Sequence, residues 1–283
     1  MQTQDLLKKY RDLLGEHKNA ALDGELILAH VLGESREYIL AHKDEDVSPE
    51  FIELFKKYTE RAIEGEPVAY ITNEKEFFGL NFYVDKRVLI PRPETEQIVE
   101  RALDFIESEK ESAPFRVLDV GTGSGNIAVS IGRNSHVEEV LSVDIDAKAL
   151  EVAKINVNQY SLENKVQLAQ SDLLEAVSEN EEFDIIVANL PYIGEVKNKF
   201  VSASTEKYEP HCALFGGESG VELYQKMFWQ LKEKNVQFKM MIGEFGFAQK
   251  EIMEELLIEN FGEKWKIEKD LAGIERIFII TNN

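Results

Sequence analysis

Four consecutive residues, Asn189-Leu190-Pro191-Tyr192, follow an apolar stretch and carry the groups needed to present a planar nitrogen. A planar NH2 group is a poor nucleophile because its lone pair is delocalised, so it must be held about 3 Å from the carbon that it attacks. The Asn189 side-chain oxygen can accept one N–H and the Leu190 carbonyl the other, while Pro191 stiffens the loop. Tyr192 can stack on the substrate plane and face a methyl sulfonium. The tetrapeptide therefore predicts methyl transfer to a planar nitrogen, with Asn189 and Tyr192 catalytic and all four residues binding the substrate; the alternative is a plain strand-terminating turn.

A glycine-rich stretch begins at Asp119 and continues through Gly121-Thr122-Gly123-Ser124-Gly125. Glycines let the backbone turn tightly and approach a ligand without side-chain clash. The stretch is not the dinucleotide fingerprint, because Asn126 stands where that motif requires glycine. A ligand without phosphate, such as S-adenosylmethionine, needs room for a methionine tail and an acceptor for its ammonium group. We predict that Asp119 is this acceptor and that residues 121–125 bind the same cofactor; the alternative is that the glycines serve only the turn.

Acidic residues follow two further predicted strands. Asp144 ends one strand, where a carboxylate can bind the ribose hydroxyls of an adenosine. Asp146, two positions later, is expected instead to cap the next helix. Asp172 can accept a hydrogen bond from the adenine amino group, with Leu173 packing beside the ring. For Asp172 the alternative is a solvated loop.

Strands and helices alternate along the chain from residue 93 onward. The alternation predicts a mostly parallel sheet with helices on both faces, and ligands of such sheets lie at the carboxyl ends of the strands. The last two strands flank Gly273 and are expected to be antiparallel to each other. The predicted strands are residues 116–120, 139–143, 166–169, 183–188, 239–243, 265–271 and 275–281, and the helices include residues 126–132, 147–160 and 249–260.

The first part of the chain has a different pattern. Apolar residues recur at helical spacing up to about residue 66, and Ser48-Pro49 is a typical helix start. Two β-rich stretches, residues 68–71 and 80–84, predict a hairpin, and Pro91 and Pro93 then fix an extended segment. We therefore expect a helical domain at residues 1–66, a hairpin and linker at 67–92 and an α/β domain at 93–283.

Composition limits the class of partner. The 283 residues carry a net charge of −21, which repels phosphate backbones and suits a basic protein or a small substrate. The single cysteine, Cys212, excludes an internal disulfide and a cysteine cluster, and we expect it to be a small packed residue. No metal site is predicted. No apolar run approaches the roughly 18 residues of a membrane span, and the start lacks a hydrophobic signal core, so the cytoplasm is the expected location.

These motifs, in this order, resemble the glutamine-N5 methyltransferases that act on peptide-chain release factors, the HemK-like family. The resemblance covers nearly the whole length and is carried by residues 22–30, 67–71, 76–80, 88–96, 189–192, 208–210, 213–217 and 269–273. It implies an α/β fold: a class I, Rossmann-like, seven-stranded methyltransferase domain preceded by a small all-α domain and a connecting β-hairpin. The family tetrapeptide usually reads Asn-Pro-Pro-Tyr, so Leu190 is a departure, as is Leu173 where some members carry an aromatic residue.

The resemblance also implies the reaction and its participants. The cofactor would be S-adenosylmethionine, with S-adenosylhomocysteine as product, contacted by residues 121–125, Asp144, Leu173 and Asn189. Residues 189–192 would hold the glutamine of the Gly-Gly-Gln loop of a class 1 release factor. Phe78 and Arg92 belong to the matching stretches and are expected to bind the substrate, with the helical domain and residues 90–95 docking the release factor. We expect a monomer that binds no nucleic acid and no membrane.

Two other functions use the same features. The first is a nucleic-acid methyltransferase that acts on adenine N6 or cytosine N4, since an exocyclic NH2 group poses the same geometric problem as an amide. The charge of −21 and the lack of a basic recognition domain argue against it. A cofactor-binding regulatory or assembly protein is the second alternative. Asn189 and Tyr192 argue against it, because a protein that only binds has no use for acceptors aimed at a methyl group.

Overall fold

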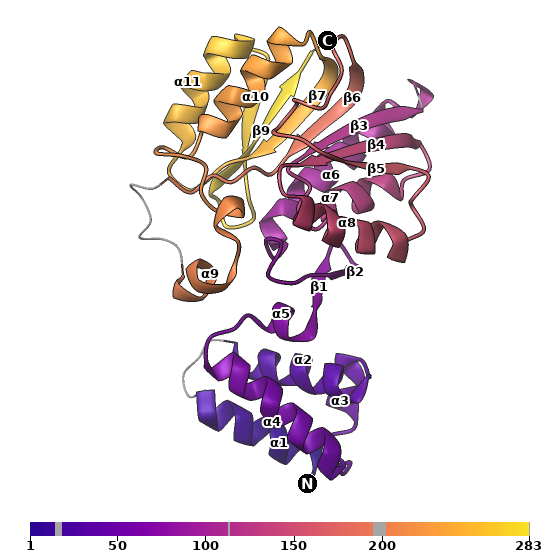
Figure 1. Ribbon diagram of the computed structural model, residues 1–283, viewed down its shortest axis with the longest axis vertical. Coiled ribbons are helices and arrows are strands. Elements are labelled where there is room, and N and C mark those ends of the chain that lie inside the picture. Colours follow the sequence, from indigo (N-terminus) through magenta and orange to yellow (C-terminus); the bar gives the residue numbers. More distant parts are fainter. Residues whose placement is uncertain (15–18, 113, 195–201, 283) are drawn as a thin grey trace. The chain divides into compact units, whose positions relative to one another are not determined.

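The computed structural model describes residues 1–14, 19–112, 114–194 and 202–282 (Figure 1). Its contacts divide the chain into two units: Met1–Glu74 with Ser202–Tyr208, and Lys75–Val201 with Glu209–Asn283. No pattern in the sequence indicates that residues 202–208 join the first unit. There the Ser204 hydroxyl donates to the Gly65 carbonyl at 2.7 Å, and the Tyr208 hydroxyl to the Glu64 carbonyl at 3.2 Å. The proposed domain boundaries at residues 66 and 92 stay predictions.

The first unit is helical, as the apolar spacing predicts. Its core contains Leu6, Tyr10, Ile27, Leu28 and Phe55, all nearly or fully buried. The Ser35 side chain accepts the amide of Tyr38 and caps one helix, and Pro49 stands at the start of another. The helices are α1 (Thr3–Leu14), α2 (Ala20–Leu32), α3 (Arg36–Ala41), α4 (Pro49–Ile63), α5 (Val68–Thr72) and α9 (Ala203–Tyr208).

The prediction of a strand at residues 68–71 is wrong, because these residues lie in helix α5. The Pro67 carbonyl accepts the amides of Tyr70 at 2.9 Å and Ile71 at 3.2 Å, and Asn73 ends the helix with a φ of 57°. Tyr70 and Ile71 are buried. Strand preference is weak and depends on context, so burial of these apolar side chains in a helix overrides it.

A hairpin does follow, one step later in the chain. Strands β1 (Glu74–Phe77) and β2 (Leu80–Tyr83) pair across a two-residue turn, Phe78 and Gly79, whose φ angles of 51° and 68° are both positive. Positive φ at both central residues is the geometry of a type I′ hairpin turn. Phe77 and Phe82 are buried in the core of the second unit.

The second unit contains the predicted sheet, whose strand order is β5-β4-β3-β6-β7-β9-β8. The strands are β3 (Phe115–Val120), β4 (Val137–Asp144), β5 (Val166–Gln170), β6 (Glu182–Ala188), β7 (Gln237–Glu244), β8 (Trp265–Lys269) and β9 (Glu275–Thr281). All neighbours are parallel except β9, which is antiparallel to both β7 and β8, as expected for the last two strands. The chain runs outward from β3 to β5 and then returns to β6 on the other side of β3. Such a reversal opens a crevice at the carboxyl ends of the two central strands.

Helices cover both faces of this sheet (Figure 1). One face packs with α6 (Glu96–Ser108), α7 (Asn126–Gly132) and α8 (Ala147–Gln159), and the other with α10 (Glu222–Glu233) and α11 (Lys250–Phe261). Short 3-10 turns are η1 (Pro93–Thr95), η2 (Lys110–Ser112) and η4 (His211–Ala213). Among the described residues, every helix is too short or too polar to cross a membrane.

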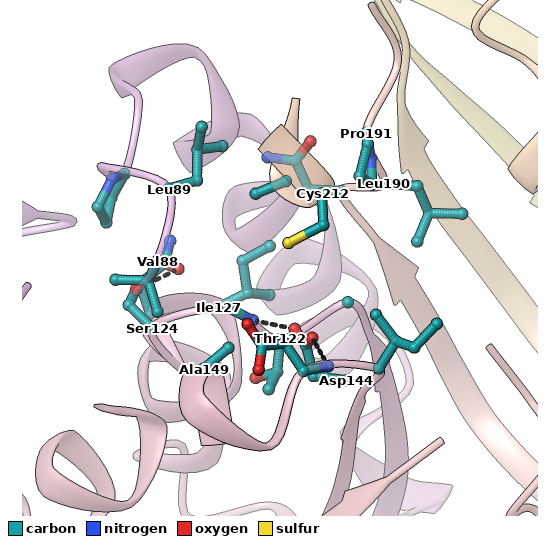
Figure 2. Close-up of a pocket in the computed structure, with 18 of the residues that line it drawn as sticks. Val88, Leu89, Thr122, Ser124, Ile127, Asp144, Ala149, Leu190, Pro191 and Cys212 are labelled. Atoms are coloured by element: carbon teal, nitrogen blue, oxygen red, sulfur yellow. Dashed lines mark hydrogen bonds between the residues drawn. The ribbon is translucent and has the colours of Figure 1, made fainter. Parts of the chain in front are cut away.

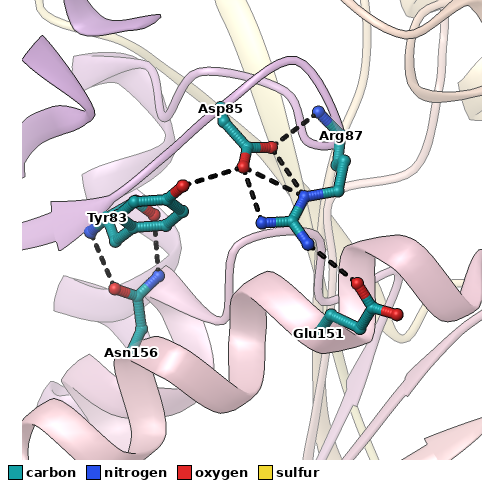
Figure 3. Close-up of polar contacts among 5 residues, drawn as sticks. All are labelled: Tyr83, Asp85, Arg87, Glu151 and Asn156. Carbon is teal, nitrogen blue, oxygen red and sulfur yellow. Dashed lines mark hydrogen bonds and ion pairs between the residues drawn. The ribbon is translucent and has the colours of Figure 1, made fainter.

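A polar network attaches the end of the hairpin to helix α8 (Figure 3). Asn156 accepts the Tyr83 amide at 2.7 Å, and its Nδ2 donates to the Tyr83 carbonyl at 2.9 Å and to the Ser124 carbonyl at 2.8 Å. Arg87 pairs with Asp85 at 2.6 Å and with Glu151 of α8 at 2.8 Å. The buried Asn156 thus joins the hairpin, α8 and the glycine loop.

Candidate active site

A cavity of about 300 Å³ lies at the carboxyl ends of β3 and β6, the point where the strand order reverses (Figure 2). This size is in the range of small-molecule sites. The sequence-predicted residues that line it are Gly121, Thr122, Gly123, Ser124, Asp144, Asp172, Leu173, Asn189, Leu190, Pro191 and Arg92. The structure therefore brings together residues from five separate stretches of the chain.

The glycine loop has the tight geometry that its composition predicts. Gly121, Gly123 and Gly125 all have positive φ, between 54° and 78°. A Cβ on Gly125 would lie 3.2 Å from the Cβ of Ala153 in α8, whereas a Cβ on Gly123 would meet nothing within 4 Å. Gly125 is thus needed for packing, and Gly123 keeps the loop open toward the cavity.

Asp144 is bound to the glycine loop. Its carboxylate accepts the Gly123 amide at 2.9 Å on one oxygen and the Asp146 amide at 2.9 Å on the other. Burial raises the pKa of Asp144. Asp146 caps α8 by accepting the Lys148 amide at 2.8 Å, which confirms the prediction. The uncommitted lone pairs of Asp144 are available to a ligand in the cavity.

Asp119, which we predict to accept the ammonium group of the cofactor, is not among the residues that line the cavity. Its side chain is fully buried, facing Thr122 and the backbone of Ala128, because the glycine loop and the start of α7 enclose it. Neither carboxylate oxygen has a hydrogen-bond partner of good geometry among the described residues. Burial raises the pKa of Asp119 from 3.8 to about 7.

The turn after β5 forms another wall of the cavity. Lys226 of α10 contacts the Asp172 carboxylate at 2.5 Å. Gln230, one turn further along α10, donates to the Asp172 carbonyl at 3.2 Å and accepts the Leu174 amide at 2.8 Å. These contacts hold Leu173, whose φ of 53° is unusual for a residue with a Cβ.

The tetrapeptide after β6 is held from several sides. Asn189 Nδ2 donates to the Thr95 hydroxyl at 3.1 Å. The Tyr192 hydroxyl donates to Glu244 Oε1 at 3.0 Å, and the Tyr192 carbonyl accepts Gln249 Nε2 at 2.7 Å. Burial raises the pKa of Tyr192. Tyr192 does not line the cavity, whereas the other three residues do.

The segment at residues 214–216 packs directly against the tetrapeptide. Ile193 donates its amide to the Leu214 carbonyl at 3.0 Å and accepts the Gly216 amide at 3.1 Å. A Cβ on Gly216 would lie 1.9 Å from the Pro191 carbonyl oxygen, so only glycine fits. This contact gives a steric reason for one of the glycines in the Ala213–Gly217 stretch.

Of the two further substrate residues that we predicted, only Arg92 lines the cavity. Its guanidinium contacts Glu209 Oε1 at 2.5 Å, and Glu209 Oε2 accepts the Ile90 amide at 3.1 Å. Phe78 lies in the hairpin turn and packs against the hydrophobic core, with its amide bound to Glu96, so the structure does not place it at the cavity. Phe78 is the first residue of the hairpin turn, and its positive φ reverses the chain into β2, so its side chain stays with the hairpin.

Several residues at the site were not anticipated. Thr95 and Cys212 line the cavity, and Glu209 and Glu244 bind residues that line it or adjoin it. Cys212 is exposed as a residue and its sulfur points into the cavity, whereas we expected a packed position (Figure 2). Partial burial of the thiol raises the pKa of Cys212, and the negative charges of Asp146 and Asp144 raise it further. Glu244 ends β7, so the rule that ligands lie at carboxyl ends of strands was sufficient to find it. Thr95 and Glu209 lie in stretches that carry the family resemblance, residues 88–96 and 208–210, but their partners are far away in the sequence, so their contacts were not predicted.

No three His, Cys, Asp or Glu side chains of the described residues are grouped so that they could hold a metal ion.

Comparison with known families and proteins gives consistent results. Residues 5–72 match the PrmC N-terminal domain, and residues 103–209 match the methyltransferase small domain. The release factor glutamine methyltransferase of Koribacter versatilis is 34% identical over 281 residues, covering 96% of this chain and 97% of that protein. The protein of the same name from Rhodopirellula baltica is 35% identical, covering 90% of this chain and 87% of that protein.

Solved structures agree on the fold. The catalytic domain of human Mettl16 in complex with an RNA hairpin has a TM-score of 0.57 at 17% identity, over 76% of this chain and 80% of that one. The 16S rRNA methyltransferase RsmC of T. Thermophilus, in complex with AdoMet and guanosine, has a TM-score of 0.53 at 20% identity, over 74% of this chain and 50% of that one. At these identities the likeness concerns the fold alone, and the fold is that of the class I methyltransferases.

Proposed function

The chain belongs to the family of release factor glutamine methyltransferases, and from that premise we propose its reaction and the residues that carry it out. It transfers a methyl group from S-adenosylmethionine to the side-chain amide nitrogen, N5, of the glutamine in the Gly-Gly-Gln loop of class 1 release factors. One observation carries the assignment: Asn189, Leu190 and Pro191 line the same cavity as the glycine loop and Asp144. An acceptor pair for a planar amide and a site for an adenosine cofactor are thus combined in one place.

The cavity suits the cofactor in size and in chemistry. The open side of Gly123 lets a ligand approach the backbone, and Asp144 presents a carboxylate at the end of β4. We propose that Gly121 to Gly125 receive the methionine part, Asp144 the ribose hydroxyls and Asp172 with Leu173 the adenine. When bound, S-adenosylmethionine supplies an electrophilic methyl group and leaves as S-adenosylhomocysteine. Asp119 lies beneath this loop and faces Thr122, and its contact with the ammonium group of the cofactor stays a prediction.

The tetrapeptide then orients the glutamine amide. The Asn189 side-chain oxygen accepts one N–H of the substrate and the Leu190 carbonyl the other, which fixes the nitrogen and its lone pair. A carbonyl serves at position 190 whatever the side chain, so leucine in place of the usual proline keeps this acceptor. Tyr192 holds the loop through its hydroxyl and its carbonyl, and stacking of its ring on the substrate stays a prediction.

The protein substrate requires a docking surface beyond the cavity. We propose that the helical first unit and residues 90–95 supply it, and that the net charge of −21 favours a basic protein surface over a nucleic acid. The protein would act as a cytoplasmic monomer without binding nucleic acid. The names of the relatives do not favour the adenine-N6 or cytosine-N4 alternative.

The test is methylation of purified release factor with isotope-labelled S-adenosylmethionine, followed by mass mapping of the labelled residue. We expect one label, on the loop glutamine, and none on a release factor that carries alanine there. A matched reaction with DNA or RNA oligonucleotides at moderate salt is the control. Label on an oligonucleotide, or on another residue of the release factor, would contradict the proposed function.

A further inference from the structure

A buried chain of hydrogen bonds leads away from the cavity, starting at the Asn189 side chain. Asn189 Nδ2 donates to Thr95 Oγ1 at 3.1 Å, and the Thr95 hydroxyl donates to Glu244 Oε2 at 2.7 Å. Thr95 and Glu244 are each 1% exposed. Asn189 follows β6, Thr95 lies in η1 and Glu244 ends β7, so the fold alone brings them together.

The carboxylate of Glu244 sets the direction of this chain. It accepts two hydroxyl protons, one on each oxygen, from Thr95 at 2.7 Å and from Tyr192 at 3.0 Å. Burial raises the pKa of Glu244 above its usual value, against the opposing effect of the two hydroxyls and the positive charge of Arg276. The direction of the hydrogen-bond chain is that of the ionised carboxylate. An ionised carboxylate accepts hydrogen bonds and donates none.

The direction at Glu244 determines the orientation of Asn189. The single proton of the Thr95 hydroxyl is committed to Glu244, so the Thr95 oxygen can act toward Asn189 only as an acceptor. An asparagine amide has nearly the same outline in its two orientations, and its partners decide between them. Turning the amide over would place its oxygen against the Thr95 oxygen with no proton between them. The NH2 group therefore faces Thr95, and the Asn189 oxygen is left as an acceptor.

We propose that Thr95 and Glu244 are positioning residues that fix which end of the Asn189 amide faces the substrate. This inference rests on the proposed function, since the substrate glutamine offers N–H groups that need an acceptor. An inverted Asn189 would present donors to those N–H groups and repel them. Neither Thr95 nor Glu244 has to touch the substrate for this effect.

Turnover of Thr95→Val and Thr95→Ser tests the proposal. Valine keeps the shape of threonine and removes the hydroxyl, so we expect kcat to fall about tenfold or more, with the KM for release factor and the cofactor Kd within about threefold of wild type. Serine keeps the hydroxyl and should stay within about threefold of wild type. Thr59→Val is a matched control, because Thr59 is a buried threonine whose hydroxyl donates only within α4. Equal turnover of Thr95→Val and wild type would overturn the inference.

A double-mutant cycle separates this role from a merely structural one. If Thr95 acts through Asn189, then Thr95→Val should slow an Asn189→Ala enzyme by less than about twofold, because there is no amide left to orient. A tenfold loss in both backgrounds would contradict the inference. Glu244→Gln serves if Thr95→Val does not fold: a glutamine amide can face Thr95 with either end, so kcat should fall in the same way.

Nuclear magnetic resonance reports the amide orientation without any activity. In the wild-type protein, the Asn189 side-chain NH2 protons should show a nuclear Overhauser effect to the Thr95 methyl group. The effect should weaken in Glu244→Gln, and its absence from wild type would overturn the inference. If wild type transferred no methyl group to release factor, the proposed function would fail, and this measurement would still decide how Asn189 is oriented.

Discussion

Two carboxylates at the centre of the second unit are buried in different ways. Glu244 binds two hydroxyl groups, whereas Asp119 is fully enclosed with no good partner among the described residues. Their roles differ accordingly: Glu244 can organise its neighbours, and Asp119 carries an energetic penalty when it is ionised. Two single residues lead to predictions: Asn189, which we propose to contact the substrate, and Asp119, which is enclosed beneath the glycine loop.

Replacing Asn189 with alanine should remove a positioning contact. We expect cofactor affinity to stay within about tenfold of wild type, while turnover of release factor falls by about two orders of magnitude or more. Cofactor titration by calorimetry and single-turnover kinetics measure the two quantities separately. Near-normal turnover would contradict the assigned role.

Asp119→Asn should change how stability depends on pH. Burial raises the pKa of Asp119 from 3.8 to about 7, so the folded state binds this proton more tightly than the unfolded state does. The stabilisation that comes from this bound proton is therefore lost as the pH rises from about 4 to about 7. The free energy of unfolding falls by at most about 1.4 kcal/mol for each pH unit in that range. Asparagine carries no such proton. We expect the variant to have a higher midpoint of thermal unfolding than wild type at pH 8, and no such advantage near pH 4. Circular dichroism measures both midpoints. A difference that does not depend on pH would contradict this reasoning.

At the scale of elements, helix α10 supports one wall of the cavity and contributes Leu223 to its lining. Lys226 and Gln230 lie one turn apart and bind the turn that contains Asp172 and Leu173. A non-glycine residue with positive φ persists only where its surroundings hold it, and such strain is frequent at ligand sites. The elements therefore act as supports: α10 for the turn that contains Asp172 and Leu173, and Asn156 of α8 for the glycine loop.

Gln230→Ala should weaken cofactor binding without slowing the methyl transfer. It leaves the buried Leu174 amide without a partner, which costs about 1–3 kcal/mol, and it frees the turn that holds Leu173. We expect the cofactor Kd to rise about tenfold, with kcat at saturating cofactor within about threefold of wild type. Lys232→Ala is the control on the same helix, since the exposed Lys232 side chain donates to the Asn260 side chain and neither residue lines the cavity. A Kd unchanged in Gln230→Ala would show that α10 is not needed for this wall.

At the scale of the whole molecule, the chain carries a large negative charge and its contacts divide it into two units. The net charge of −21 is the sum over the whole sequence. The helical unit has a hydrophobic core of its own. Residues 202–208 belong to this first unit, although residues before and after them belong to the second.

Ionic strength should therefore affect the protein substrate more than the cofactor. Screening of long-range attraction between an acidic enzyme and a basic protein surface weakens their association as salt rises. We expect the KM for release factor to rise several-fold between about 0.05 and 0.3 M NaCl, with the cofactor Kd changing by less than about twofold. Steady-state kinetics over this range, with a short Gly-Gly-Gln peptide as the control substrate, measure the effect. A KM that falls with salt would contradict an electrostatic contribution to docking.

The sequence by itself determined the succession of strands and helices along the second part of the chain, the glycine loop and the position of the tetrapeptide. These features follow from local rules: apolar residues repeat with the period of a strand or helix, and glycine appears where a turn or a close approach requires it. Because parallel strands present their carboxyl ends at one edge, this order was enough to place Asp144 and Asn189 at a common site. The family resemblance then identified the nitrogen as a glutamine amide.

Only the tertiary structure decided which groups support that site. It turned residues 68–71 into a helix, enclosed Asp119 beneath the glycine loop and joined Asn189 to Thr95 and Glu244. The separation between Thr95 and Glu244 is 149 positions, and between Thr95 and Asn189 it is 94. Contacts over such separations depend on how helices and strands pack against one another, and no local pattern of residue types encodes that packing.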